Sequence, residues 1–332
     1  MIPAGSKRIK THAVPELVAD PAEYRVILDD MFRHGGKLIP EPNWLMTVDV
    51  SAPAESYDPA KAAEFALSDE AFAKVSSYMN LMSAWVGGSQ PPSPEEIEKY
   101  SQFIPHFDPL GLWESASASS LGRQDLGSIM DLNLLYSFRH TETGPVTRIL
   151  EVGGGYGRLA EAAYNIFGDS IQYVMIDSVP ASLYYAKKYL DRACPYAKVW
   201  SYYESMHPLD MSRCNIIIIP SWHFERINTM MYDVCINIES MQEMNQFHVD
   251  HYLSLFDRIA FNDGTIYLSN AHEYYFRGDF NYPANWQKLF CSNTPRSNLC
   301  HDHPTEIFRK TRGDYSAPNR ALDAAHKYLS VR

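Results

Sequence analysis

The stretch from Arg148 to Phe167 limits the folds open to this chain more than any other, because it reads as a strand, a glycine turn and a helix in succession. Its apolar run ends at Glu151 and is followed by glycines at alternate positions, Gly153, Gly155 and Gly157. Residues 158–167 are good helix formers whose apolar side chains fall on one stripe. Because glycine has no side chain to keep a ligand away, this turn predicts close contact between backbone N–H groups, a helix N-terminus and a ligand.

A second strand, residues 171–176, ends at Asp177, twenty positions after Gly157. An acid at the tip of the second strand of a βαβ unit can accept hydrogen bonds from both ribose hydroxyls, so the ligand is predicted to contain a nucleoside. A dinucleotide fingerprint needs G-x-G-x-x-G, and counting from Gly153 puts Arg158 where the third glycine belongs. The spacing therefore disfavours a dinucleotide. A glycine-rich turn that binds nothing is the alternative, and the acids at both expected positions speak against it.

The pattern acid-x-Gly-x-Gly-x-Gly, which starts at Glu151, resembles motif I of the class I S-adenosylmethionine (SAM) methyltransferases. Together with Asp177, Pro180 and the segment from Asp233 to Met244, it makes the sequence similar to the sugar O-methyltransferase family over about residues 125 to 310. Many methyltransferases share the glycine motif, whereas residues 237–244 are the more family-specific part of the resemblance.

This resemblance implies an α/β fold, with a Rossmann-like class I methyltransferase sheet, helices on both faces and an N-terminal helical appendage. It implies SAM as the cofactor, S-adenosylhomocysteine (SAH) as a product, and methyl transfer to a hydroxyl of a sugar or similar small metabolite in natural-product or surface-glycan biosynthesis. Two alternatives stay open. One is a methyltransferase of a non-sugar intermediate, acting at a polyketide hydroxyl, a carboxyl or a phosphonate. The other is a methyltransferase-like binding module without catalysis.

Cofactor contacts are predicted at the glycine turn and at the tips of the strands beside it. The third strand is ambiguous, because residues 198–203 and 215–219 both have the composition of a strand. If the second is the strand, residues 220–223 lie beside the adenine ring. The predicted cofactor-binding residues are Glu151, Gly153, Gly155, Tyr156, Gly157, Asp177, Ser178, Ser221, Trp222 and Asn237.

Methyl transfer to oxygen requires an acceptor held in line with the methyl group and benefits from a base that shares the hydroxyl proton. In the class I arrangement the methyl group points toward the C-terminal ends of the fourth and fifth strands, predicted at 232–239 and 264–269. The candidate bases there are His272, Glu243, Glu239 and His248. These candidates have structural alternatives. A histidine after a strand is commonly a surface residue, and Glu243 could instead cap the helix that follows it.

Two histidine pairs invite a metal interpretation. His248 and His251 are three positions apart on a predicted helix, but no carboxylate stands at ligand spacing, which favours a solvated helix face. His301 and His303 fit a surface turn before Pro304 better than a metal site. No metal ligand is therefore predicted, although some sugar methyltransferases use a divalent ion.

Composition narrows the partners. The 332-residue chain carries a formal net charge of −11 and no cluster of Lys and Arg, which argues against a nucleic-acid substrate and favours a small-molecule acceptor. Its five cysteines are odd in number and include no C-x-x-C pair, so neither a disulfide framework nor a zinc site is indicated. No apolar stretch reaches the length of a membrane span, and the N-terminus lacks the apolar core of a signal peptide. A cytoplasmic protein without membrane contact is expected.

The chain is predicted to divide near residue 140. Residues 1–140 should form a helical region that covers the cofactor end of the sheet, binds substrate or pairs subunits, for instance in a homodimer, and residues 141–332 the cofactor-binding domain. The expected helices of the first region are 22–32, one capped by Asp58 with Pro59 at its first position, 68–86, one opened by a capping box at Ser93 to Glu96, and 125–138. After a fifth strand at 264–269, residues 286–290 and 305–309 fit an antiparallel edge pair, and 319–329 a helical tail.

Overall fold

The computed structural model describes a large part of the chain. The described residues are 20–34, 68–70, 72–74, 76–77, 92–115, 123–139, 146–202, 213–227, 230–271, 280–295 and 304–311. The predicted helical tail at 319–329, the predicted helix that follows Asp58 and most of the predicted helix at 68–86 lie outside them. None of the helices in these ranges is both long enough and apolar enough to cross a membrane.

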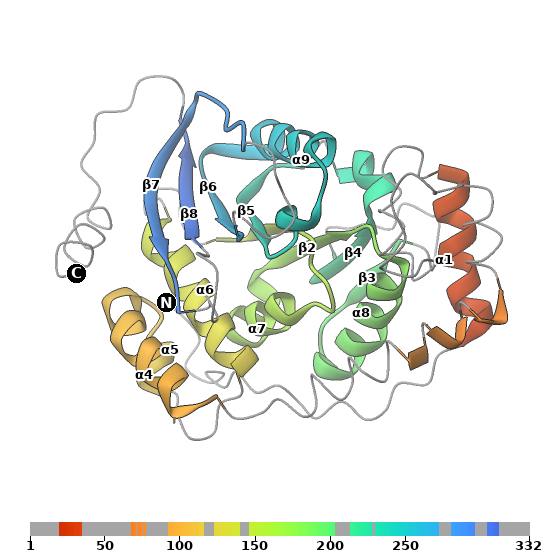
Figure 1. The fold of residues 1–332 in the computed structure, drawn as a ribbon, viewed down its shortest axis with the longest axis horizontal. Coiled ribbons are helices and arrows are strands. Elements are labelled where there is room, and N and C mark those ends of the chain that lie inside the picture. Colours follow the sequence, from red (N-terminus) through yellow and green to blue (C-terminus); the bar gives the residue numbers. More distant parts are fainter. Residues whose placement is uncertain are drawn as a thin grey trace.

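One sheet organises the described residues, with eight strands in the order β3-β4-β2-β1-β5-β6-β8-β7 (Figure 1). The strands are β1 (Arg148–Val152), β2 (Gln172–Asp177), β3 (Val199–Ser201), β4 (Ile216–Pro220), β5 (Tyr232–Ile238), β6 (Ala260–Ser269), β7 (Trp286–Asn293) and β8 (Pro304–Lys310). Strands β1 to β6 run parallel to one another, whereas β8 pairs antiparallel with both β6 and β7. The predicted antiparallel edge pair is confirmed.

Helices cover both faces of this sheet, because successive residues of a buried strand point to opposite sides. Ile149 and Tyr173 pack on one face, together with α6 (Arg123–Phe138), α7 (Arg158–Phe167) and α8 (Pro180–Ala193). Leu150 and Val174 pack on the other, together with α9 (Gln246–Ile259) and the 3-10 helix η9 (Ser221–Ile227). The Rossmann-like α/β fold predicted from the sequence is therefore confirmed.

The third strand of the prediction proves to be two strands. Residues 199–201 form β3 at the edge of the sheet, and residues 216–220 form β4, which lies between β3 and β2. Strand β4 is the apolar run Ile216–Ile219 closed by Pro220, and all five residues are buried. Pro220 is the register partner of Asp177, so the segment after β4 begins beside the acid at the tip of β2.

The described helices of the N-terminal third lie at opposite ends of the sheet (Figure 1). Helix α1 (Pro21–His34) packs on α8 and η9, beside the β3–β4 end. Helix α4 (Pro94–Phe103), the short 3-10 helix η4 (Ile104–Phe107) and α5 (Leu112–Ser115) lie near α6 and the β7 end, where the ring of Phe107 contacts Phe290 at 5.6 Å between centroids. The capping box predicted for α4 is confirmed, because Ser93 and Glu96 exchange side-chain hydrogen bonds with each other's backbone N–H.

Candidate functional site

The glycine turn joins β1 to α7 at the point where the strand order reverses, since β1 has β2 on one side and β5 on the other. The N–H groups of Gly153 and Gly154 both donate to the carbonyl oxygen of Ile176, at 2.8 and 3.3 Å. These bonds hold the turn against the end of β2. In open α/β sheets, ligands bind outside the carboxyl ends of the strands at such a switch point, so this edge is the candidate site.

Two glycines of the turn differ in what surrounds them. Gly153 has a φ of +76°, and a Cβ placed there would lie 2.0 Å from Oγ of Ser240. Gly155 has a φ of +54°, but a Cβ placed there would meet no protein atom within 4 Å. Packing therefore requires glycine at position 153, while Gly155 borders open space that a ligand can occupy.

Asp177, at the tip of β2, contacts the turn at Gly155. Its Oδ2 accepts a hydrogen bond from the N–H of Gly155 at 2.9 Å, and its Oδ1 accepts one from the N–H of Val179 at 2.8 Å. Burial raises the pKa of Asp177 to about 6, although the backbone donors oppose this rise. A carboxylate oxygen can accept more than one hydrogen bond, and two ribose hydroxyls require such acceptor capacity.

Three predicted cofactor residues lie inside the protein. Glu151 is 4% exposed and accepts a hydrogen bond from the hydroxyl of Tyr173 at 2.8 Å, and burial raises its pKa to about 7. Asn237 is fully buried and donates to the carbonyl oxygen of Val152 at 2.9 Å, which ties the end of β5 to the end of β1. The ring of Tyr156 packs edge-on against Tyr189 of α8. All three residues support the glycine turn from the protein interior.

The predicted adenine end is assembled from β2, β4 and α9. The hydroxyl oxygens of Ser178 and Tyr252 are 3.5 Å apart, and Ser221 is fully buried. Trp222 is 6% exposed, and its indole N–H donates to Asp30 of α1 at 2.8 Å. Sequence reasoning missed both Tyr252 and Asp30. Tyr252 lies on the apolar face of its helix, so its position in the sequence indicates a core residue. No sequence pattern indicates a contact between residues 30 and 222.

The predicted acceptor end carries two more carboxylates. Glu239 follows β5 in a left-handed conformation with a φ of +55°, a backbone geometry unusual for a residue with a side chain, and it is exposed. Glu243 belongs to the 3-10 helix η10 (Met241–Glu243) and is partly buried. Burial raises its pKa to about 7, and the charges of Glu239 and Asp177 raise it further. Glu239, Glu243 and Asp177 are thus close enough to interact.

The capping alternative for Glu243 is wrong. The N-cap of α9 is Asn245, whose side chain accepts a hydrogen bond from the N–H of His248 at 3.1 Å. Glu243 lies two residues before this cap, and its carboxyl group is left for another role.

The described contacts of the candidate histidines do not indicate a role in catalysis or in metal binding. His248 lies in the first turn of α9, where its ring contacts Phe247. The ring of His251 packs on Phe224, and burial lowers its pKa, helped by the charges of His248 and Arg258. Within the ranges that the structure describes, no three His, Cys, Asp or Glu side chains are arranged to hold a metal ion. His272 lies outside the described residues, as do His301 and His303.

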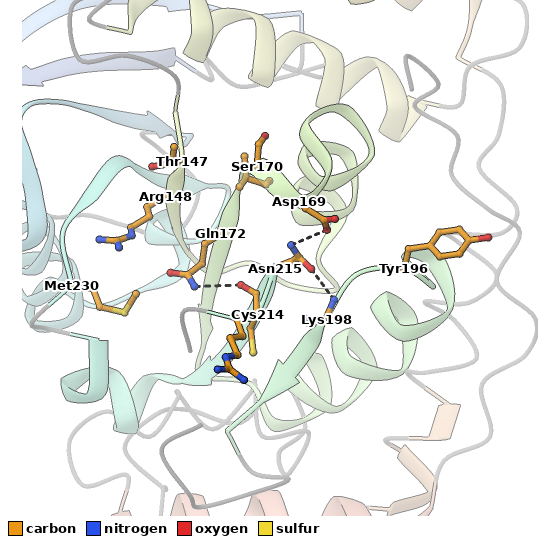
Figure 2. A pocket seen from close by; sticks show the side chains of 12 residues that line it. Thr147, Arg148, Asp169, Ser170, Gln172, Tyr196, Lys198, Cys214, Asn215 and Met230 are labelled. Atoms are coloured by element: carbon orange, nitrogen blue, oxygen red, sulfur yellow. Dashed lines mark hydrogen bonds between the residues drawn. The ribbon is translucent and has the colours of Figure 1, made fainter. Parts of the chain in front are cut away.

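A cavity of about 570 Å³ opens at the amino ends of the strands, where β1, β2 and β4 begin (Figure 2). Its lining includes Arg148, Gln172, Lys198 and Asn215, and Asn215 is hydrogen-bonded to Asp169 and to the backbone of Lys198. It lies away from the glycine turn and Asp177. The cavity is therefore separate from the predicted nucleoside site at the carboxyl ends of the strands.

No protein-family model matches this sequence, and no curated protein matches it. Among solved structures, the chain is similar to a proposed O-methyltransferase from Klebsiella pneumoniae, with a TM-score of 0.39, 11% identity, and coverage of 70% of this chain and 96% of that one. It is also similar to a TehB-like SAM-dependent methyltransferase from Corynebacterium glutamicum, with a TM-score of 0.38, 13% identity, and coverage of 66% and 100%. These similarities are too weak to assign a family or a function. The fold class is defined by the strand order and the glycine turn of this chain.

Proposed function

We propose that this protein is a SAM-dependent O-methyltransferase that methylates a hydroxyl of a sugar or a similar small metabolite. The observation that carries the proposal is the pairing of Gly155, which borders open space, with Asp177, whose buried carboxylate reaches across the turn to Gly155 at 2.9 Å. A nucleoside ligand needs this combination of an accessible backbone and an acid for its ribose. The glycine spacing of motif I favours SAM over a dinucleotide.

The residues present fit this cofactor. Asp177 would hold the ribose, Gly155 would allow close approach of the amino-acid part, and Ser221 and Trp222 would border the adenine. When bound, SAM supplies an electrophilic methyl group. Glu151 and Asn237 keep the turn in shape through their buried hydrogen bonds to Tyr173 and Val152.

We favour Glu243 as the base because of its raised pKa. With a pKa raised to about 7, it is poised to take a proton from an acceptor hydroxyl near neutral pH, where a base acts best when its pKa is close to the working pH. Glu239 helps to keep that pKa high through its negative charge. These carboxylates also repel anions, which favours a neutral hydroxylated acceptor such as a sugar over a carboxylate or a phosphonate. His272 is the alternative base.

A thermal-shift titration tests the cofactor assignment. SAM and SAH should raise the melting temperature of the protein and NAD should not, because a ligand that binds only the folded state stabilises it. Asp177→Ala, and the nearly isosteric Asp177→Asn, should lose the SAH-dependent shift. Asp191→Ala removes an exposed acid on α8 and should retain it. A shift that persists in both Asp177 variants, or a shift with NAD alone, would overturn the proposal.

A further inference from the structure

Asp30 of α1 connects the N-terminal part of the chain to the segment after β4. One of its carboxylate oxygens, Oδ2, accepts two hydrogen bonds, from the indole N–H of Trp222 at 2.8 Å and from Nε2 of His223 at 2.7 Å. The side chains of Asp30 and His223 are only 14% and 11% exposed. Such a shared acceptor holds two neighbouring side chains in one relative orientation.

Asp30 is held as a carboxylate. Burial alone would raise its pKa, but the hydrogen bonds from His223 and Trp222 and the nearby charges of His223 and His34 outweigh burial, and the pKa is lowered. Hydrogen bonds to an ionised acceptor are roughly twice as strong as those between neutral groups. Losing Asp30 would therefore leave the buried indole N–H of Trp222 without its charged partner.

The segment held by Asp30 adjoins the proposed ribose acid. Pro220 is the register partner of Asp177, and Trp222 follows two positions later. The next residue of this segment, His223, packs its ring on Tyr202 at 4.2 Å between ring centroids. The position of Trp222 is thus set from both ends, by strand pairing at Pro220 and by Asp30 on α1.

We propose that Asp30 is a positioning residue for the nucleoside end of the cofactor site, acting through Trp222 and His223 although it lies 192 positions from Trp222 in the sequence. This inference rests on the proposed function. It makes α1 a structural part of the cofactor site, so that this part of the N-terminal third serves cofactor binding.

Variants at Asp30 should fold, because α1 has other anchors. Its side chains Ile27 and Met31 are fully buried. The hydroxyl of Tyr184 in α8 accepts from the N–H of Asp20 at 2.8 Å and donates to Glu23 at 3.0 Å. The two hydrogen bonds of Tyr184 lie about two to three turns before Asp30 and do not involve its side chain.

The test is the dissociation constant for SAH of four proteins, measured by titration calorimetry. Asp30→Ala should raise it about tenfold, the loss expected for a hydrogen bond to a charged group. Asp30→Asn keeps an oxygen acceptor and should raise it less. Asp29→Asn, which changes an exposed acid of the same helix that lies 3.9 Å from Arg33, should match the wild type.

Trp222→Phe tests the other end of the hydrogen bond, because it keeps an aromatic ring and removes the N–H donor. It should weaken SAH binding in the same direction, and Asp30→Asn should add little further loss in that background. If Asp30→Ala lowers the melting temperature of the ligand-free protein but binds SAH like Asp29→Asn, Asp30 is only a structural tether and the inference is overturned. A wild-type protein that binds no SAH would instead overturn the proposed function, and this inference with it.

Discussion

Glu243 lies where a negative charge is disfavoured. It is partly buried in η10, and the charges of Glu239 and Asp177 act on it in the same direction as burial, so its pKa rises to about 7. Perturbed carboxyl groups of this kind cluster at functional sites. The adjoining Glu239 adds a second sign of function, because its left-handed backbone stores strain at the end of β5.

Glu243→Gln should lower kcat by about 10² to 10⁴, the usual contribution of a positioned general base, with little effect on SAH binding. In the wild type, kcat should rise with pH through about 7, because the carboxylate is the active form and its pKa is raised to about 7. Rate measurements between about pH 5.5 and pH 8.5 check both statements.

Glu239→Gln is the matched variant for this test. It removes a neighbouring negative charge and should move the rise in kcat to lower pH while keeping most of the maximal rate. If Glu243→Gln keeps the wild-type rate and pH profile, Glu243 is not the base and His272 becomes the first alternative.

At the level of single residues, the sequence predicts what local spacing encodes. Asp177 could be placed because its distance from Gly157 is that of a βαβ unit, and the structure puts its carboxylate on Gly155. Asp30 could not be placed, since its partners come from η9 and no local pattern links the two segments. The perturbed pKa of Glu243 was likewise out of reach, because it depends on burial and on charges brought close by folding.

The glycine turn is the element whose substitution separates folding from ligand binding. Gly153 and Gly155 both have positive φ, so alanine is strained at either position, by roughly 1–2 kcal/mol. Only at Gly153 would the added Cβ also collide with the protein, at 2.0 Å from Oγ of Ser240.

Gly153→Ala should therefore lower the melting temperature much more than Gly155→Ala. Gly155→Ala should stay folded and lose SAH affinity, because its methyl group would project into the space assigned to the ligand. Melting curves with and without SAH distinguish the two effects. Equal melting temperatures for the two variants, or wild-type SAH affinity in Gly155→Ala, would contradict this account of the turn.

Among the elements, apolar runs and helix periodicity predicted most strands and helices at about the right positions, but not their order in the sheet. From the sequence, residues 198–203 and 215–219 are alternatives for the third strand, whereas the structure has a strand in each segment, β3 and β4. Strand order arises from long-range pairing, which composition does not encode. The true cap of α9, Asn245, was also overlooked, although its residue type is a common N-cap.

At the scale of the whole molecule, the described N-terminal helices flank the sheet at both ends. Helix α1 adjoins the proposed nucleoside end through Asp30, and η4 adjoins β7 through Phe107 (Figure 1). The sequence predicted α1 and α4 but not η4 or α5, and it did not predict where α1 and α4 pack, because a local apolar pattern does not specify the neighbour that it contacts. This arrangement agrees with a role for α1 in cofactor binding, which the Asp30 variants test.

A crystal structure of the protein with SAH is the most direct test of the proposed cofactor site. We expect SAH at the carboxyl ends of the strands, with its ribose hydroxyls on Asp177, its amino-acid part close to the backbone of Gly155 and its sulfur on the side of Glu243. This expectation would be contradicted by SAH bound elsewhere, or by an Asp177 carboxylate that keeps its bonds to Gly155 and Val179 and makes no contact with the ribose.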